Sequence, residues 1–244
     1  MRVESRIGFS PSLGHDLEYR VYGHGGQPLV AFSSMNGRFY DFENFGMVDG
    51  IARFLEAGRL TLYTLDSIDW QSWTNAELHP SERARRHEAY DRYVASEFIP
   101  LVREEMGRAT TWVTGCSMGA YHASNFFFRH PDLADGLIAI SGVYQVRRFI
   151  GDFVDDGVYF NSPLLYLPNL DDQWYLERYR RSQLAFCIGQ GRWEEECLAE
   201  TRAMQAILDA KQVPATFDYW GYDVDHDWPW WRRMLPHQLE RLGI

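Results

Sequence analysis

The fold is decided by residues 110–123, which read TTWVTGCSMGAYHA. A β-branched, apolar run leads into the pentapeptide GCSMG at 115–119, and an apolar, alanine-containing segment follows at once. This order predicts a strand, a sharp turn and a helix, with the Ser117 hydroxyl projecting above the edge of a sheet. Gly115 and Gly119 suit such a turn, because a Cβ at either position would collide with the neighbouring strand or helix. The alternative is a glycine-rich turn in which Ser117 only caps the helix.

The composition favours one α/β domain that covers residues 1–244. Of these 244 residues, 45% are hydrophobic and 16% aromatic, which is enough for a full core. The formal charge of −10 argues against nucleic acid or an anionic membrane as a partner. We therefore expect a small-molecule partner, and the sequence leaves open whether the chain forms a homo-oligomer.

The N-terminal residues and the cysteines favour a cytoplasmic location. Residues 1–10 are of mixed polarity, and no apolar run approaches the roughly 20 residues that a membrane span needs. Three cysteines without zinc-like spacing do not indicate a disulfide framework. Cys116, beside Ser117, is interpreted as a packing residue. No cofactor and no metal ion are expected.

Apolar runs and turn residues predict alternating strands and helices. Strands are expected at residues 2–9, 17–22, 28–32, 60–65, 136–140, 184–188 and 215–220. The first two should form an antiparallel pair. One helix is expected over 49–57 and a long one over 81–106, which Pro100 should kink or break. Arg83 and its arginine neighbours are expected on the solvated face of the long helix. This alternation argues for a mainly parallel sheet with helices on both faces.

Residues 142–183 interrupt the alternation with an irregular, aromatic-rich insertion. One interpretation is a cap over the site, whose apolar walls would exclude water and bind acyl or aryl groups. The other is a surface excursion that needs aromatic side chains to stay folded. Residues 66–73 allow a similar choice between a pocket wall and a packed loop, and we prefer the packed loop.

A serine nucleophile needs two partners, and the chain order supplies candidates for both. The hydroxyl is a poor nucleophile unless an imidazole accepts its proton and a carboxylate orients that imidazole. Where a turn of this kind carries the nucleophile, the acid and then the histidine follow it along the chain. Of eight histidines, only His226 lies between the last expected strand and the last expected helix. His226 is therefore the candidate general base.

The carboxylate is narrowed to two glutamates. An aspartate three residues beyond the glycine that ends the penultimate strand is a common arrangement, but Arg192 stands three residues after Gly189. The loop after Gly189 is therefore expected to be two or three residues longer, which favours Glu194 or Glu195 as the acid. A glutamate side chain can reach the histidine as an aspartate would. Either glutamate could instead only complement a helix dipole. Weaker candidates are Asp155, Asp172, Asp223 and Asp225.

Backbone N–H groups for an oxyanion are expected at two places. One is Met118, directly after the serine, and the other is Ser34 or Met35, in the small polar loop that follows strand 28–32. The alternative for residues 33–37 is an ordinary loop between a strand and a helix.

Three segments resemble the putative-esterase group of α/β-hydrolases. They are GCSMGAYHA at 115–123, RHPDL at 129–133 and HDWPWWRR at 226–233. S-formylglutathione hydrolases and bacterial mycolyltransferases are relatives in this group. The resemblance implies a three-layer sandwich and serine-dependent acyl transfer, with Ser117 as nucleophile and His226 as base. The chain departs from the group's pattern at the acid.

We therefore expect a serine carboxylesterase that cleaves a small-molecule ester through an acyl-serine intermediate. One alternative is an acyltransferase that uses the same residues. The other is a non-catalytic member of the fold that binds a ligand or a protein.

Overall fold

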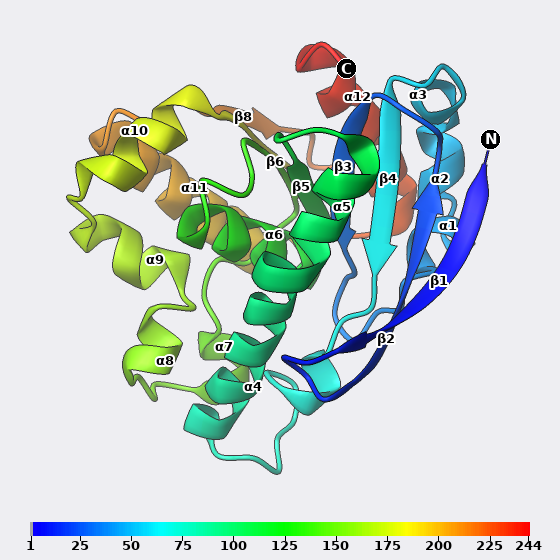
Figure 1. The fold of residues 1–244 in the computed structure, drawn as a ribbon. Helices are drawn as coiled ribbons and strands as arrows, with labels where there is room; N and C mark the ends of the chain where they lie inside the picture. The colour runs from blue at the N-terminus through cyan, green and yellow to red at the C-terminus, as the bar shows by residue number, and fades with distance from the viewer. Residues whose placement is uncertain (1) are drawn as a thin grey trace.

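The computed structural model describes residues 2–244 and contains an eight-stranded sheet (Figure 1). The strands are β1 (Val3–Ser10), β2 (His15–Tyr22), β3 (Gln27–Phe32), β4 (Leu60–Leu65), β5 (Trp112–Cys116), β6 (Gly136–Ile140), β7 (Gln183–Ile188) and β8 (Thr216–Tyr219). Their spatial order is β1-β2-β4-β3-β5-β6-β7-β8. Strand β2 pairs antiparallel with β1 and β4, and the other pairs are parallel. The expected mainly parallel sheet is confirmed.

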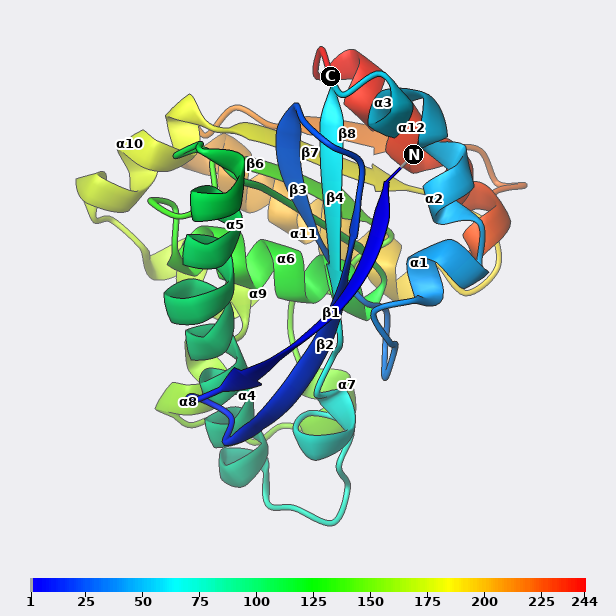
Figure 2. The ribbon, with the colours of Figure 1, turned by 45° about the vertical axis from the view of Figure 1, so that its right-hand side comes forward.

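Helices cover both faces of the sheet (Figure 2). On one face lie α1 (Asp41–Asn44), α2 (Met47–Gly50), α3 (Ala52–Glu56) and α12 (Trp228–Arg241). On the other lie α4 (Pro80–Tyr93), α5 (Ile99–Met106), α6 (Met118–Arg129) and α11 (Glu195–Ala210). The prediction of a single helix over 49–57 is wrong in its extent. The segment contains parts of two short helices, α2 and α3, which Ile51 separates. Gly50 packs so closely against α12 that a Cβ there would lie 2.9 Å from the Arg232 carbonyl oxygen.

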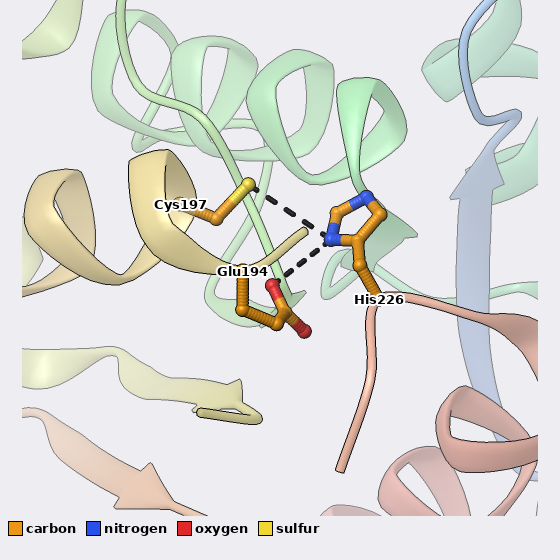
Figure 3. Close-up of side chains that lie close together, drawn as sticks. All are labelled: Glu194, Cys197 and His226. Atoms are coloured by element: carbon orange, nitrogen blue, oxygen red, sulfur yellow. Dashed lines mark hydrogen bonds and ion pairs between the residues drawn. The ribbon is translucent and has the colours of Figure 1, made fainter. Parts of the chain in front are cut away.

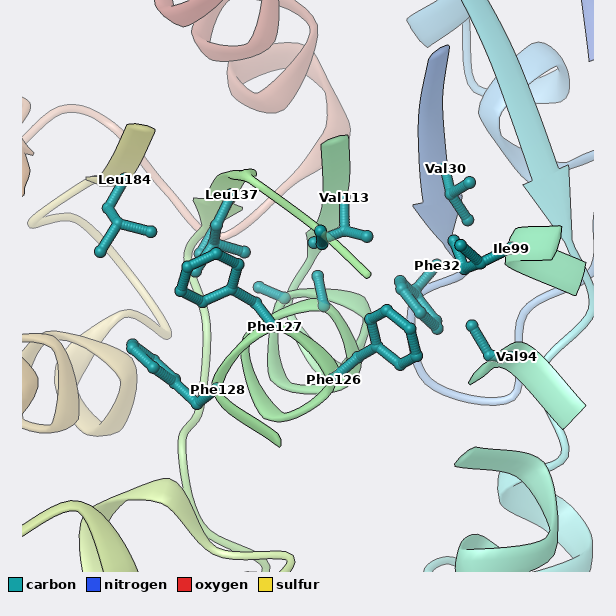
Figure 4. Close-up of a cluster of buried hydrophobic side chains, with 14 of the residues drawn as sticks. Val30, Phe32, Val94, Ile99, Val113, Phe126, Phe127, Phe128, Leu137 and Leu184 are labelled. Carbon is teal, nitrogen blue, oxygen red and sulfur yellow. The ribbon is translucent and has the colours of Figure 1, made fainter. Parts of the chain in front are cut away.

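The helix after the serine turn is the centre of the larger core cluster (Figure 4). Phe126 and Phe127 of α6 are buried beneath strand residues such as Phe32 and Leu137. Burying one such ring is worth about 1.5–3 kcal/mol. Since β3, β5 and β6 contribute continuous apolar runs and are covered on both faces, α6 is held firmly against the middle of the sheet.

The long helix is divided as Pro100 predicts. Helices α4 and α5 are joined by a π-helical turn at Val94–Phe98, directly before Ile99 and Pro100. Proline lacks an N–H and its ring crowds the carbonyl four residues earlier, so a wider turn relieves the clash. The expected exposure of Arg83 is wrong. Its guanidinium is buried and donates to the carbonyl oxygen of Phe149 at 2.9 Å, because the inserted segment covers this turn.

Residues 142–183 form short helices between β6 and β7. They are α7 (Arg147–Ile150), α8 (Asp156–Tyr159), α9 (Pro163–Tyr166), a 3₁₀ turn (Leu167–Asn169) and α10 (Gln173–Arg181). The side chains of Asp155 and Asp172 accept hydrogen bonds from backbone N–H groups in the first turns of α8 and α10. Both of these weaker acid candidates are therefore helix caps. Within residues 2–244, no helix is both long enough and apolar enough to cross a bilayer.

Substituting Gly119 by alanine is expected to destabilise the fold by about 1–3 kcal/mol. A Cβ at this position would lie 2.3 Å from the carbonyl oxygen of Phe32, so α6 would have to move away from β3. The measurement is urea unfolding followed by tryptophan fluorescence. Gly8→Ala is the matched control, since no atom lies within 4 Å of a Cβ built there. Equal unfolding midpoints for the two variants would contradict the prediction.

Candidate active site

Ser117 occupies a strained turn between β5 and α6. Its backbone has φ 58° and ψ −121°, a conformation that costs an L-residue about 1–3 kcal/mol. The surroundings fix it there: the Ser117 N–H donates to the Ile140 carbonyl oxygen at 2.9 Å. A Cβ on Gly115 would lie 2.2 Å from the carbonyl carbon of Gly119, so only glycine allows the turn to close this tightly. The strained turn places the Ser117 side chain at the carboxyl end of the parallel strands.

Ser117, His226 and Glu194 form a continuous hydrogen-bonded chain. The Ser117 Oγ lies 2.9 Å from His226 Nε2, and His226 Nδ1 lies 2.9 Å from Glu194 Oε2. A carboxylate only accepts hydrogen bonds, so Nδ1 carries the proton and Nε2 is left as an acceptor for the serine hydroxyl. This is the tautomer that a general base requires.

Glu194 is completely buried, and two further residues hold it in place. Ser141 Oγ donates to Glu194 Oε1 at 2.5 Å, and the Trp231 indole N–H donates to Ser141 Oγ at 3.1 Å. The Trp231 ring also packs edge-on against the imidazole of His226, with centroids 5.0 Å apart. The sequence reasoning missed Ser141. Its position directly after a buried strand, beside a glycine, was the available signal.

Hydrogen bonds between two loops explain why the carboxylate of Glu194 stands further from Gly189 than the common spacing of three residues. The Gly191 N–H donates to the Val224 carbonyl oxygen at 2.9 Å, and the His226 N–H donates to the Arg192 carbonyl oxygen at 3.0 Å. Two guanidinium nitrogens of Arg192, Nε and Nη2, donate to Asp225 Oδ2 at 2.9 and 2.7 Å. Residues 189–193 therefore run alongside the histidine loop before the chain turns toward the imidazole.

The Ser117 hydroxyl faces a cavity of about 660 Å³. Its lining includes the predicted residues Ser34, Met35, Ser117, Met118, Glu195 and His226. Aromatic side chains form much of the wall, namely Phe149, Trp193, Trp228 and Trp231. Phe149 belongs to α7, so the start of the 142–183 insertion contributes to this wall. An ion pair of 3.1 Å between Arg148 and Glu196 lies beside it.

The two backbone segments expected to bind an oxyanion line the same cavity as Ser117. Met118 is the first residue of α6, where N–H groups have no acceptor within the helix. Ser34 and Met35 lie in the loop after β3, which is closed by a bond from the Gly37 N–H to the Ser34 carbonyl oxygen at 2.7 Å. Ser33 Oγ anchors the start of this loop by donating to the Leu65 carbonyl oxygen at 2.8 Å.

A buried carboxylate connects this loop to the serine helix. Asp69 Oδ2 accepts the backbone N–H of Asn36 at 3.0 Å, and Asp69 Oδ1 lies 2.7 Å from His122 Nε2. Both Asp69 and His122 are buried, and Asn36 has a left-handed φ of 56°. Asp69 therefore fixes the position of residues 34–36 relative to α6. The preferred interpretation of residues 66–73 as a packed loop agrees with these contacts, although Trp70 is exposed.

Asp69→Asn is expected to lower kcat about 10- to 100-fold while KM changes little. Losing a whole oxyanion donor costs about 10²–10³, and a displaced loop should cost part of that. Steady-state ester hydrolysis gives kcat and KM. Affinity for a trifluoromethyl ketone, which mimics the tetrahedral intermediate, should fall in parallel with kcat/KM. Asp66→Asn is the control, since Asp66 accepts the N–H of Phe39 at 2.8 Å but does not contact Asn36. Equal losses in both variants would refute a specific role for Asp69.

The cysteines behave mainly as packing residues. Cys116, Cys187 and Cys197 are buried free thiols. Burial raises the pKa of the Cys116 thiol well above its usual value, which agrees with its interpretation as a packing residue. Cys197 differs in its surroundings, because its Sγ lies 3.9 Å from His226 Nδ1 (Figure 3).

Comparison with known proteins assigns the chain to a family. The sequence profile of the family described as Putative esterase matches residues 10–242. A search of curated proteins found no match.

Several solved structures share the fold. A ferulic acid esterase is 18% identical with a TM-score of 0.78, and the alignment covers 99% of this chain and 97% of that one. An S-formylglutathione hydrolase from Agrobacterium tumefaciens is 14% identical with a TM-score of 0.73, covering 99% and 95%. The fluorophosphonate-binding serine hydrolase FphF from Staphylococcus aureus is 16% identical with a TM-score of 0.64, covering 99% and 98%. The chain has the α/β-hydrolase fold, belongs to the Putative esterase family and is a carboxylesterase-type serine hydrolase.

Proposed function

We propose that Ser117, His226 and Glu194 are the catalytic residues of this esterase. The observation that carries the proposal is the unbroken chain of 2.9 Å contacts from Ser117 Oγ through the imidazole to Glu194, which opens into a cavity. Glu195, the other candidate acid, lines the cavity next to this chain and is assigned no part in proton transfer.

The reaction proceeds through an acyl-serine. Ser117 Oγ attacks the ester carbonyl carbon while His226 Nε2 takes the hydroxyl proton, and the Glu194 carboxylate stabilises the resulting imidazolium. The N–H groups of Met118 and of Ser34 or Met35 stabilise the oxyanion. The imidazolium returns its proton to the leaving alcohol. A water molecule then gives a proton to the same nitrogen and attacks the acyl carbon. The bond to Ser117 Oγ breaks, the imidazolium returns the proton to that oxygen, and the acid is released.

The cavity favours esters with a small, flat aromatic group. The aromatic side chains of Trp193, Trp228 and Phe149 line the cavity, and stacking between rings is worth about 0.5–1.5 kcal/mol beyond buried area. One structure of the same fold is named a ferulic acid esterase, which agrees with such a substrate. In this proposal the α7 part of segment 142–183 serves as a partial cap over the acyl group.

Labelling with a fluorophosphonate probe tests the catalytic residues, with the modified peptide identified by mass spectrometry. The probe should label Ser117 in the intact chain, and His226→Ala should abolish labelling. The substrate class is tested by comparing kcat/KM for methyl ferulate and methyl butyrate. A preference for the ferulate supports the aromatic site, and a preference for the butyrate refutes it.

The acyltransferase alternative is separated by product analysis. Added alcohol or thiol acceptors should not divert most of the acyl group from water if the chain is a hydrolase. The cytoplasmic location stays a prediction, and the three buried free thiols agree with it.

A further inference from the structure

A thiol lies beside the imidazole of His226, on the side away from the serine. Cys197, in the first turn of α11, points its thiol at His226 Nδ1, the same atom that contacts Glu194 (Figure 3). The thiol sulfur, the ring nitrogen and a carboxylate oxygen all lie within 4.8 Å of one another. The acyl transfer described above gives Cys197 no task.

We propose that Glu194, Cys197 and His226 form an inhibitory site for a thiophilic divalent cation, of which Zn²⁺ is the best fit. This inference rests on the proposed function of His226. Thiolate, imidazole and carboxylate are the three ligand types that zinc takes in proteins. The site is not a cofactor site, because an occupied cluster would compete with catalysis.

The distances suit a tetrahedral ion. Usual zinc–ligand lengths place tetrahedral nitrogen and oxygen ligands about 3.3 Å apart, and nitrogen and sulfur ligands about 3.6 Å apart. The corresponding separations here are 2.9 Å and 3.9 Å, so small side-chain rotations would make room. Cys197 and His226 both line the cavity, which provides an entry path and space for a water molecule as fourth ligand.

The carboxylate ligand is already oriented. Ser141 holds the other oxygen of Glu194, and such outer hydrogen bonds tune metal sites. A cation that binds Cys197 as the thiolate displaces the thiol proton to solvent.

Occupation of the site removes the general base. With the ion on Nδ1, the proton of that nitrogen moves to Nε2 and the imidazole stays neutral. Nε2–H can then only donate toward Ser117 and cannot take the hydroxyl proton. Glu194 simultaneously leaves its hydrogen bond with the imidazole for the metal. The imidazole that accepts the Ser117 proton and the carboxylate that orients this imidazole are thereby both removed from the reaction.

The test uses the purified full-length chain, with Cd²⁺ as spectroscopic probe and Zn²⁺ as inhibitor. Cd²⁺ should produce a thiolate-to-metal charge-transfer band that saturates at one equivalent. Zn²⁺ should inhibit ester hydrolysis, and EDTA should restore it. Cys197→Ser should abolish the band and raise the half-inhibitory Zn²⁺ concentration about tenfold or more, since even an outer-shell change costs 10–100-fold. Cys187→Ser, which removes another buried thiol, should keep both responses.

Each result has a definite meaning. A band that survives Cys197→Ser, or equal zinc inhibition in that variant and the unmodified chain, overturns the proposal. If the unmodified chain hydrolyses esters but gives no band, the metal site fails and the catalytic assignment stands. If it hydrolyses no ester, the cadmium band still tests the site. Cys197→Ala serves as a second variant, and circular dichroism shows whether each variant is folded.

Discussion

Ser117→Ala is expected to lower kcat for ester hydrolysis by about 10⁵- to 10⁶-fold. The variant keeps the cavity and the oxyanion donors but has no oxygen to form the acyl intermediate. The variant is still expected to hydrolyse the ester about 10³-fold faster than the uncatalysed reaction in water, because the remaining groups can polarise a bound ester. Hydrolysis of a para-nitrophenyl ester, followed by absorbance and normalised to folded protein, gives the ratio.

The matched control is a buried serine of α6, the helix that begins directly after Ser117. Ser124 is fully buried, and its Oγ makes no hydrogen bond within residues 2–244. Ser124→Ala should therefore leave kcat within a few-fold of the unmodified chain. Near-normal turnover by Ser117→Ala would show that a different group carries the acyl chain.

Glu194→Gln is expected to lower kcat by about 10³- to 10⁴-fold. Glutamine keeps the shape but loses the charge that stabilises the imidazolium. Its amide can also rotate to donate a hydrogen bond to Nδ1, which fixes the tautomer that cannot accept the Ser117 proton. Because Ser141 donates to the atom on the other side, the amide oxygen would lie at Ser141 and the amide N–H at Nδ1, which reinforces the wrong tautomer. Pre-steady-state acylation rates separate this loss from changes in product release.

Glu195→Gln tells the two neighbouring glutamates apart. Its side chain lines the cavity without contacting the imidazole, so its loss should stay within about tenfold and fall mainly on KM. A larger loss of kcat for Glu195→Gln than for Glu194→Gln would reverse the assignment of the acid.

Local patterns were enough to select Ser117 and His226 as candidates, and their side chains lie 2.9 Å apart. The strand, glycine-flanked turn and helix around Ser117 depend on neighbouring residues, and His226 stands at a point in the chain that the order of elements defines. The central strands were predictable for the same reason, since each is a short apolar run buried on both faces. The family match over residues 10–242 agrees with this interpretation.

Features that depend on distant contacts were not predictable. The choice between Glu194 and Glu195 depends on how far the preceding loop follows the histidine loop before it turns. Arg83 was expected in solvent because its helical position is polar, yet a carbonyl group 66 residues later in the chain accepts its hydrogen bond. Asp69 and His122 each fit an ordinary structural residue until the fold brings them together.

The pairing of residues 189–193 with residues 224–226 has a consequence for evolution and for engineering. Each segment supplies backbone partners of the other, so neither can change length alone without leaving backbone amide groups unpaired. A relative's shorter acid loop could be grafted into this scaffold only together with that relative's histidine loop. The two segments should therefore be inherited, and exchanged in chimeras, as one cassette.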